Sequence, residues 1–295
     1  MLRQLGSGLP RGVVEHPGVV SGHQPHGLTP VEHPADPVER DVHVGDAVHV
    51  DERAIAVDID GAAAEETAAL VGGIGMACDL ASGDAVRALA ARVEREVGTV
   101  TVLCCNAGVG PGAPVADMTE DDWTWLLGVN VWGVIHPLRA FLPGIRREGG
   151  HVLVTSSMAA FAPNPPLGGY AATKAAVTAM SEVLAAELAG SEPAVGVTLL
   201  SPGPTRSAIG TSQRHRDTDS EARLVDIDLE RQGYDWIRWR DPAEVAASAL
   251  DAIEADELYA FSHPELVDRV TARNARIVEA FARAASQPTR RPPST

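Results

Sequence analysis

Val100-Thr101-Val102-Leu103-Cys104-Cys105-Asn106-Ala107-Gly108 is the stretch that decides the fold. Its first six residues are β-branched or apolar, and the run closes in a turn of small and polar residues. An unbroken run of this kind is typical of a strand that is buried on both faces of a sheet. It therefore predicts a parallel strand inside an α/β domain.

The chain on either side of this stretch alternates short β-branched runs with amphipathic helical patterns. Such alternation predicts one doubly wound, parallel α/β domain of the Rossmann type over residues 53–286. Residues 1–52 are rich in Pro, Gly and His, so we expect an irregular segment not native to the fold, and a disordered tail at 287–295. We expect strands at 54–58, 74–78, 100–105, 151–155, 195–200 and 258–261, and helices at 62–70, 82–97, 119–132, 170–188 and 264–285, with a further one starting at Asp241-Pro242.

The composition limits the partners. The formal net charge of −16 disfavours nucleic acids and anionic membranes. With no apolar run of about 18 residues and no signal pattern, we expect a soluble, cytoplasmic protein. Three cysteines, Cys78, Cys104 and Cys105, lack the spacing of a metal site or a disulfide framework, so we interpret them as buried free thiols.

Tyr170 and Lys174 are four residues apart in a helical stretch and therefore lie on one face, one turn from each other. A tyrosine phenol has a pKa of about 10, and a nearby ammonium group lowers it by favouring the phenolate. The pair could thus exchange a proton with an alcohol or a carbonyl oxygen. Such spacing is also common on solvated helix surfaces, so the pair proves nothing alone.

Two further residues fall in register with the pair. Asn130 lies in Val129-Asn130-Val131-Trp132-Gly133, and Ser157 ends Thr155-Ser156-Ser157 at a strand exit, where α/β sheets bind ligands. Ser157 would hold the reacting oxygen with a second hydrogen bond. Ser156 is the alternative serine.

In these residues the chain resembles the short-chain dehydrogenase/reductase family, from about Arg53 to Phe261. The family's Asn–Ser–Tyr–Lys tetrad matches Asn130, Ser157, Tyr170 and Lys174, with the family's usual spacing from the serine to the tyrosine. The resemblance implies an alcohol/carbonyl oxidoreductase of class EC 1.1.1 that acts on a small molecule without a metal, as a homodimer or homotetramer. It also implies that the asparagine props open a helix kink and orders a water in a proton relay. The implied cofactor contacts are Asp58, Asp79, Asn106, Tyr170, Lys174, Pro202, Gly203 and Thr205, with Ser207 nearby. The family usually has two asparagines where this chain has Cys105 and Asn106.

Asp58 indicates which cofactor is used. It ends the strand 54–58, where a carboxylate accepts hydrogen bonds from the ribose of NAD and repels the extra phosphate of NADP. No arginine follows it closely, so we favour NAD over NADP. Asp60 is the alternative carboxylate.

The family opens with a strand and a glycine-rich turn that cradles the pyrophosphate, and we find neither. Gly72-Gly73-Ile74-Gly75 leads into a strand instead of a helix, and 21–27 is a poorer match. In the family's strand order 3-2-1-4-5-6-7 the absent strand is central, and 42–50 is the best candidate to fill it. The abrupt change near Arg53 suggests that residues 1–52 derive from a shifted reading frame or a misplaced start.

Three functions compete. An intact tetrad favours an NAD-dependent oxidoreductase, whereas the absent glycine turn favours a catalytically weak or inactive relative. A nucleotide-sugar epimerase of the family's extended branch fits less well, because no sizeable C-terminal substrate domain is evident. The substrate pocket should be lined by the loop from Arg206 to Trp239.

Overall fold

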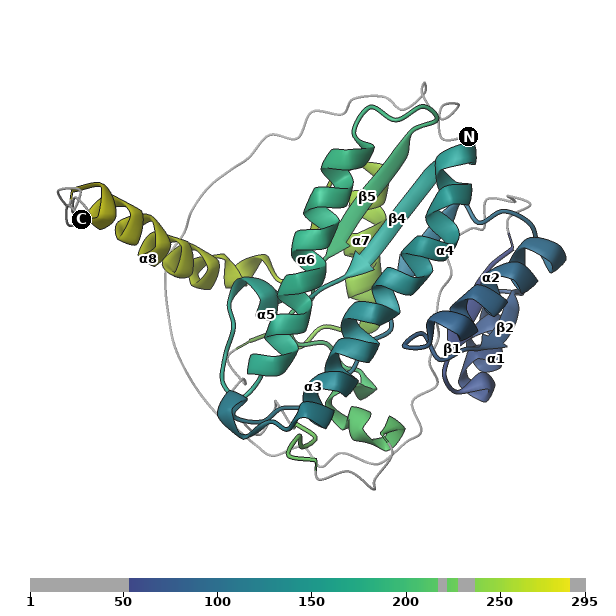
Figure 1. Cartoon of the computed structure of the whole chain (residues 1–295). Coiled ribbons are helices and arrows are strands. Elements are labelled where there is room, and N and C mark those ends of the chain that lie inside the picture. The colour runs from purple at the N-terminus through teal and green to yellow at the C-terminus, as the bar shows by residue number, and fades with distance from the viewer. Residues whose placement is uncertain (1–52, 217–221, 228–236, 287–295) are drawn as a thin grey trace, which may run out of the picture. The chain divides into compact units, whose positions relative to one another are not determined.

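A computed structural model describes residues 53–216, 222–227 and 237–286. Helices and strands alternate along these residues, as the sequence predicts (Figure 1). The predicted irregular segment 1–52, the strand proposed at 42–50 and the tail 287–295 lie outside the described residues. The elements are β1 (Ile55–Asp58), α1 (Gly61–Leu70), β2 (Ile74–Ala77), α2 (Gly83–Glu96), β3 (Val102–Cys105), α3 (Glu120–Leu127), α4 (Gly133–Glu148), β4 (Gly150–Thr155), α5 (Met158–Phe161), α6 (Gly168–Leu188), β5 (Val195–Leu200), α7 (Pro242–Glu254), β6 (Tyr259–Ala260) and α8 (Val267–Ser286).

The strands form two parallel sheets, one of β1 and β2 and one in the order β3-β4-β5-β6. The longest ladder joins β4 to β5, from Gly150 opposite Val195 to Thr155 opposite Leu200. Parallel neighbours joined by helical crossovers define a Rossmann-type α/β fold, which confirms the predicted fold class.

A central pairing is missing from the described part of the chain. The predicted strand order places one strand between β1 and β3, yet no described strand pairs with the free edge of either. Val102 is accordingly 49% exposed, and Cys104 is exposed too. The predictions that 100–105 is buried on both faces, and that all three thiols are buried, are therefore wrong for Val102 and Cys104. Cys105 and Cys78 are buried as expected.

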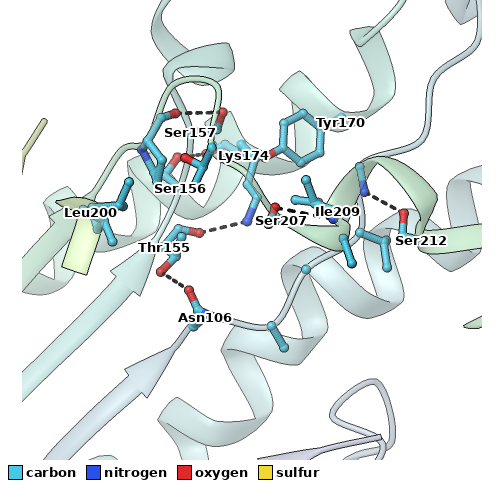
Figure 2. A pocket seen from close by; sticks show the side chains of 18 of the residues that line it. Asn106, Thr155, Ser156, Ser157, Tyr170, Lys174, Leu200, Ser207, Ile209 and Ser212 are labelled. Carbon is cyan, nitrogen blue, oxygen red and sulfur yellow. Dashed lines mark hydrogen bonds between the residues drawn. The ribbon is translucent and has the colours of Figure 1, made fainter. Parts of the chain in front are cut away.

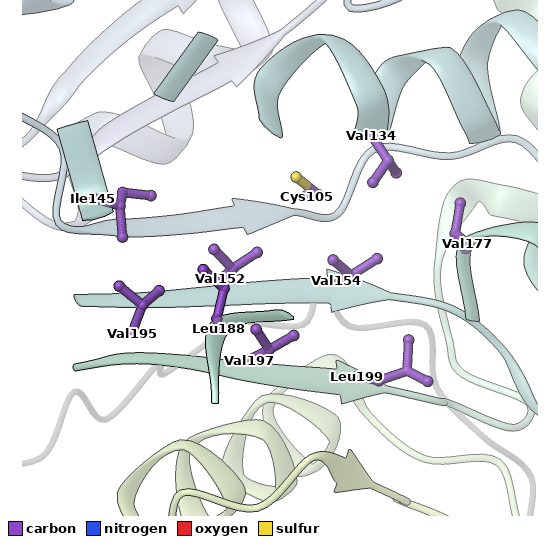
Figure 3. Packing of buried hydrophobic residues seen from close by; sticks show 10 residues of the cluster. All are labelled: Cys105, Val134, Ile145, Val152, Val154, Val177, Leu188, Val195, Val197 and Leu199. Carbon is purple, nitrogen blue, oxygen red and sulfur yellow. The ribbon is translucent and has the colours of Figure 1, made fainter. Parts of the chain in front are cut away.

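The core is built on β4 and β5, the two described strands in which most residues are buried. On one face their valines and leucines pack against α4 and α6 (Figure 3). On the other face Leu153 and Leu200 pack against Val245 and Ala249 of α7. Helices therefore cover both faces of the sheet, which gives the four strands β3 to β6 a rigid base. The buried members of the first cluster are Cys105, Val134, Ile145, Val152, Val154, Val177, Leu188, Val195, Val197 and Leu199.

Capping residues set the helix starts where the sequence predicts them. Ser82 caps α2, and Thr119 with Asp122 forms a capping box at α3. The expected single helix at 119–132 is interrupted, however, because a π-helical turn, Gly128–Trp132, separates α3 from α4. A π-helical turn of this kind often marks a functional site. None of the described helices is both long and apolar enough to cross a bilayer.

Candidate active site

A cavity of about 1580 Å³ lies at the carboxyl ends of the strands. It is bordered by residues that end or directly follow β1, β2, β3, β4 and β5. This is where open parallel sheets bind ligands. Of the predicted site residues, all but Asn130 line it: Asp58, Asp79, Asn106, Ser157, Tyr170, Lys174, Pro202, Gly203 and Thr205.

Lys174 connects helix α6 to the end of β4. Its side chain is only 2% exposed, and its Nζ donates a hydrogen bond to the Thr155 carbonyl at 2.8 Å. The same Nζ lies 5.8 Å from the centroid of the Tyr170 ring, one helical turn away. Figure 2 shows both side chains beside the cavity, with Lys174 reaching to Thr155 and Thr155 in turn to Asn106. The expected tyrosine–lysine pair is therefore present in space.

The electrostatics of the pair differ from the sequence-based expectation. Burial raises the pKa of Tyr170, and a hydrogen bond with Ser157 lowers it only in part. Burial also lowers the pKa of Lys174 to about 8. The pKa of the phenol is thus raised overall and not lowered as predicted, because loss of water opposes charge on both groups. In this structure the phenol is held in its protonated form.

The two serines at the end of β4 have different surroundings. Ser156 is buried and donates to the Lys174 carbonyl at 3.0 Å, with Thr178 Oγ1 2.7 Å away. Ser157 is partly exposed, lines the cavity, and hydrogen-bonds to the Tyr170 phenol. Ser156 therefore fixes β4 to α6, and Ser157 is the serine available to a ligand.

Asn130 lies in the π-helical turn and is fully buried behind the cavity. Its Oδ1 accepts from the Val109 amide at 2.9 Å, and its Nδ2 donates to the Val109 carbonyl at 2.9 Å and to Thr173 Oγ1 at 3.0 Å. Thr173 donates in turn to the Tyr170 carbonyl at 2.7 Å. Asn130 thus joins the segment after β3 to the turn of α6 between Tyr170 and Lys174. The sequence analysis missed Thr173, since a threonine inside a helix gives no signal of such a role.

The two candidate carboxylates, Asp58 and Asp60, have different positions relative to the cavity. Asp60 caps α1 by accepting from the Ala62 amide at 3.0 Å and does not border the cavity. Asp58 lines the cavity at the exposed end of β1. It accepts from the Asp60 amide at 2.9 Å, which fixes the carboxylate in place. Of the two carboxylates, Asp58 is therefore the one that a ligand in the cavity could reach.

The residues around the cavity fit the two ends of a dinucleotide. A Cβ added to Gly108 would lie 3.3 Å from both Asn130 Oδ1 and Lys174 Nζ. A glycine at this position therefore lets the chain after β3 lie close to both side chains. At the far end, Asp79 accepts from the Ala81 amide at 2.9 Å and borders the cavity. Asp58 and Asp79 could accept hydrogen bonds from an adenosine there, and Tyr170, Lys174 and the Pro202–Thr205 loop could contact a nicotinamide.

No glycine turn for the pyrophosphate is found in the described ranges. Gly72 has a φ of +65° and joins α1 to β2, with the Gly73 amide donating to the Ala68 carbonyl at 2.8 Å. This confirms the interpretation of 72–75 as a turn before a strand.

A segment from the expected substrate loop covers the other side of the cavity. We call its described parts, 208–216 and 222–227, the substrate segment. Gly110 donates its amide to Ser212 Oγ at 3.1 Å, and Gly112 and Val225 exchange two backbone hydrogen bonds of 3.0 Å. Ile209 and Ile227 of this segment line the cavity, so the loop expected to line the substrate pocket does border the space next to Tyr170.

Comparison with known proteins gives the same picture. The short chain dehydrogenase family model matches residues 47–218, more than half of the chain. The probable oxidoreductase EphD of Mycobacterium tuberculosis is 38% identical over 208 residues, which are 67% of this chain and 34% of EphD. The chain thus spans about a third of the length of that relative.

Two more proteins show how this similarity extends. The inactive 2-(S)-hydroxypropyl-CoM dehydrogenase 2 of Xanthobacter autotrophicus is 29% identical over 211 residues, 69% of this chain and 88% of that protein. A crystal structure of a short-chain dehydrogenase/reductase from Burkholderia phymatum in complex with NAD superposes with a TM-score of 0.67, at 30% identity, covering 81% of this chain and 88% of that one. By fold, site and family model, the chain belongs to the short-chain dehydrogenase/reductase family.

Proposed function

We propose that the protein is an NAD-dependent oxidoreductase that interconverts an alcohol and a ketone or aldehyde. The observation that carries this proposal is the placement of Ser157, Tyr170 and Lys174 around one cavity, with Asn130 bracing them from behind. The cavity is large enough for a dinucleotide together with a small substrate.

Tyr170 is the general acid/base of this proposal. In oxidation the alcohol O–H bond breaks and the Tyr170 oxygen takes the proton, while the carbon loses a hydride. In reduction the phenol gives its proton to the carbonyl oxygen as the carbon gains a hydride. Bound NAD supplies the hydride acceptor for oxidation, and NADH supplies the hydride for reduction.

The other residues orient the reaction. The Ser157 hydroxyl holds the reacting oxygen beside the phenol, and Lys174 holds the ribose next to the nicotinamide. Asp58 would accept from the adenosine ribose hydroxyls, which favours NAD over NADP. Apolar side chains of the substrate segment exclude water from the reacting atoms.

A second candidate, a weak or inactive family member, is supported by a specific observation. No described strand joins β1 to β3, and the family supplies its phosphate-binding turn from a strand at that position. One relative carries the name of an inactive dehydrogenase. Homodimer or homotetramer formation and a cytoplasmic location remain expectations from the sequence.

Turnover separates the two candidates. The chain is incubated with a panel of secondary and primary alcohols at high NAD or NADP concentration, and NADH or NADPH formation is followed by absorbance. We expect NAD-dependent turnover that Tyr170→Phe reduces by about 10²- to 10⁴-fold while the circular dichroism spectrum is kept. A Tyr170→Phe rate within tenfold of the parent would contradict the role of the phenol, and no turnover in the parent would favour the inactive alternative.

A further inference from the structure

His263 is a buried histidine outside the proposed catalytic group. It follows β6 and is 1% exposed. Its Nδ1 lies 3.0 Å from the Gly203 amide nitrogen and 2.8 Å from Ser262 Oγ. Its Nε2 lies 3.1 Å from the carbonyl oxygens of both Pro204 and Arg238. Every polar atom of the ring is therefore engaged.

These partners determine the protonation state of the ring. A backbone N–H can only donate, so Nδ1 must accept from Gly203. Backbone carbonyls can only accept, so Nε2 must carry the proton and donate to Pro204 and Arg238. His263 is consequently a neutral imidazole protonated on Nε2.

The ring is also the physical support of the loop after β5. A Cβ added to Gly203 would lie 2.7 Å from His263 Cγ, so the imidazole packs directly on the Gly203 backbone. Pro202 and Pro204 have no N–H, and Gly203 is thus the one residue between them that can donate from the main chain. Because Pro202, Gly203 and Pro204 all border the cavity, a ring that fixes Gly203 fixes the cavity wall.

Two charged groups act on the ring from outside. Glu265 and Arg240, which pair at 3.4 Å, oppose each other, since the carboxylate favours a charged imidazole and the guanidinium disfavours it. Burial, the largest cause, lowers the pKa of His263. The ring stays neutral at physiological pH, and protonation in acid would turn Nδ1 into a donor facing another donor.

We propose that His263 is a positioning residue whose neutral, Nε2-protonated ring fixes the Pro202–Thr205 loop for the nicotinamide end of the cofactor and ties it to Arg238. This role of His263 rests on the proposed function only in taking the nicotinamide cofactor as the ligand of the loop. Holding the loop through Gly203 is a property of the chain itself, so it can be measured without any cofactor.

Two substitutions divide the roles of the ring nitrogens. In His263→Asn the amide oxygen can take the place of Nδ1 and accept from Gly203, whereas the longer glutamine of His263→Gln places its amide nearer the Nε2 position. The matched control is His151→Asn. His151 is also buried and has its Nε2 2.9 Å from Thr198 Oγ1, but Thr198, unlike Gly203 and Pro204, does not border the cavity.

The first readout is hydrogen exchange of the Gly203 amide, and the second is NADH affinity. We expect His263→Asn to keep the exchange protection of the Gly203 amide within about threefold of the parent. His263→Gln should lower that protection by at least about tenfold and also weaken NADH binding. His151→Asn should change neither. Equal loss in both His263 variants, or unchanged protection in both, would overturn the proposal. If the parent fails to bind NADH, the proposed function fails, but the exchange result still decides the role of His263.

Nitrogen NMR of the imidazole in the unmodified chain gives a test that needs no variant. We expect His263 to carry its proton on Nε2 at neutral pH, and the Gly203 amide to lose protection in acid as Nδ1 becomes protonated. A ring protonated on Nδ1, or protection that stays constant down to the pH at which the chain unfolds, would overturn the proposal.

Discussion

At the residue scale, the pKa values of Tyr170 and Lys174 predict how the rate of oxidation depends on pH. Burial raises the pKa of Tyr170, so the phenol is protonated at neutral pH and ready to donate in reduction. Oxidation needs the deprotonated oxygen, and its rate should rise with pH. Lys174 has a pKa of about 8, so its cation favours the phenolate only below that pH.

Lys174→Ala should therefore slow oxidation by about tenfold or more below about pH 8, where the parent carries the cation that favours the phenolate, and by less above that pH. The measurement is kcat/KM for oxidation against pH. Reduction at neutral pH is the internal control: it reports the loss of the proposed Lys174–ribose contact alone, since the protonated phenol does not need the cation. Superimposable oxidation profiles would show that the two groups are not coupled.

Asp58 should select the cofactor. Asp58→Ala removes both the acceptor for the ribose hydroxyls and the repulsion of the extra phosphate of NADP. We expect the ratio of kcat/KM for NAD to that for NADP to fall by at least about tenfold, which is 1.4 kcal/mol. The matched control is Asp60→Ala, which removes the cap of α1 and should leave the ratio unchanged. If the Asp60 variant shifts the ratio and the Asp58 variant does not, the two roles have been assigned the wrong way round.

At the scale of the elements, Asp122 joins helix α3 to the substrate segment. Its Oδ1 pairs with Arg216 Nη1 at 2.5 Å, and its Oδ2 accepts from the Arg223 amide at 3.1 Å. The side chains of Asp122 and Arg216 are buried, at 0% and 7% exposure respectively. The Arg216 guanidinium lies 5.3 Å from the centroid of the Trp125 ring. Burial by itself would raise the pKa of Asp122, but these hydrogen bonds outweigh it and the pKa is lowered. Asp122 therefore stays charged and holds the segment down.

Asp122→Asn should release the substrate segment. A lone buried guanidinium costs about 3–5 kcal/mol, and local opening of the segment returns it to water at lower cost than unfolding the domain. We expect faster proteolysis within 208–227 and a higher KM for the substrate, with a smaller change in kcat. Thr119→Ala, which weakens the cap of α3 and keeps the ion pair, is the control and should cost about 1 kcal/mol of stability without exposing the segment. Equal proteolysis of the two variants would contradict the role of the pair.

Local chemistry explains which elements the sequence analysis could predict. The starts of α2 and α3 follow from Ser82 and from the Thr119–Asp122 box, because a capping side chain bonds to its own helix. The π-helical turn around Asn130 could not be predicted, since it is held by Val109 and Thr173, which are distant in sequence. The tetrad, Ser157 included, was recognisable from its residue types and spacing, while the raised pKa of Tyr170 depends on burial by residues distant in sequence.

At the scale of the whole molecule, the principal departure from the expected sheet is that no described strand pairs with the free edge of β1 or of β3. Exposed strand edges template aggregation, so we expect the chain to be poorly soluble at high concentration. We also propose that the DNA just upstream of the codon for Arg53, read in another frame, encodes an apolar strand and a glycine-rich turn. Sequencing and translating that DNA checks this directly, and the absence of such a turn from every frame would end the proposal.

A chain carrying that strand and turn in place of residues 1–52 should bind NAD more tightly. The backbone amides of the turn and the helix N-terminus that follows it would receive the pyrophosphate. The chain as it stands should bind weakly, in the millimolar range. Micromolar affinity in the chain as it stands would instead mean that another phosphate cradle exists.

We propose that the cavity holds NAD through contacts at the two ends of the dinucleotide. A titration of NADH into the full chain, followed by nucleotide fluorescence, tests it most directly, with Asp58→Ala and Asp60→Ala titrated in parallel. We expect weak, saturable binding that Asp58→Ala weakens by at least about tenfold and Asp60→Ala preserves. Binding that does not saturate at any concentration, or that survives in Asp58→Ala unchanged, would contradict it.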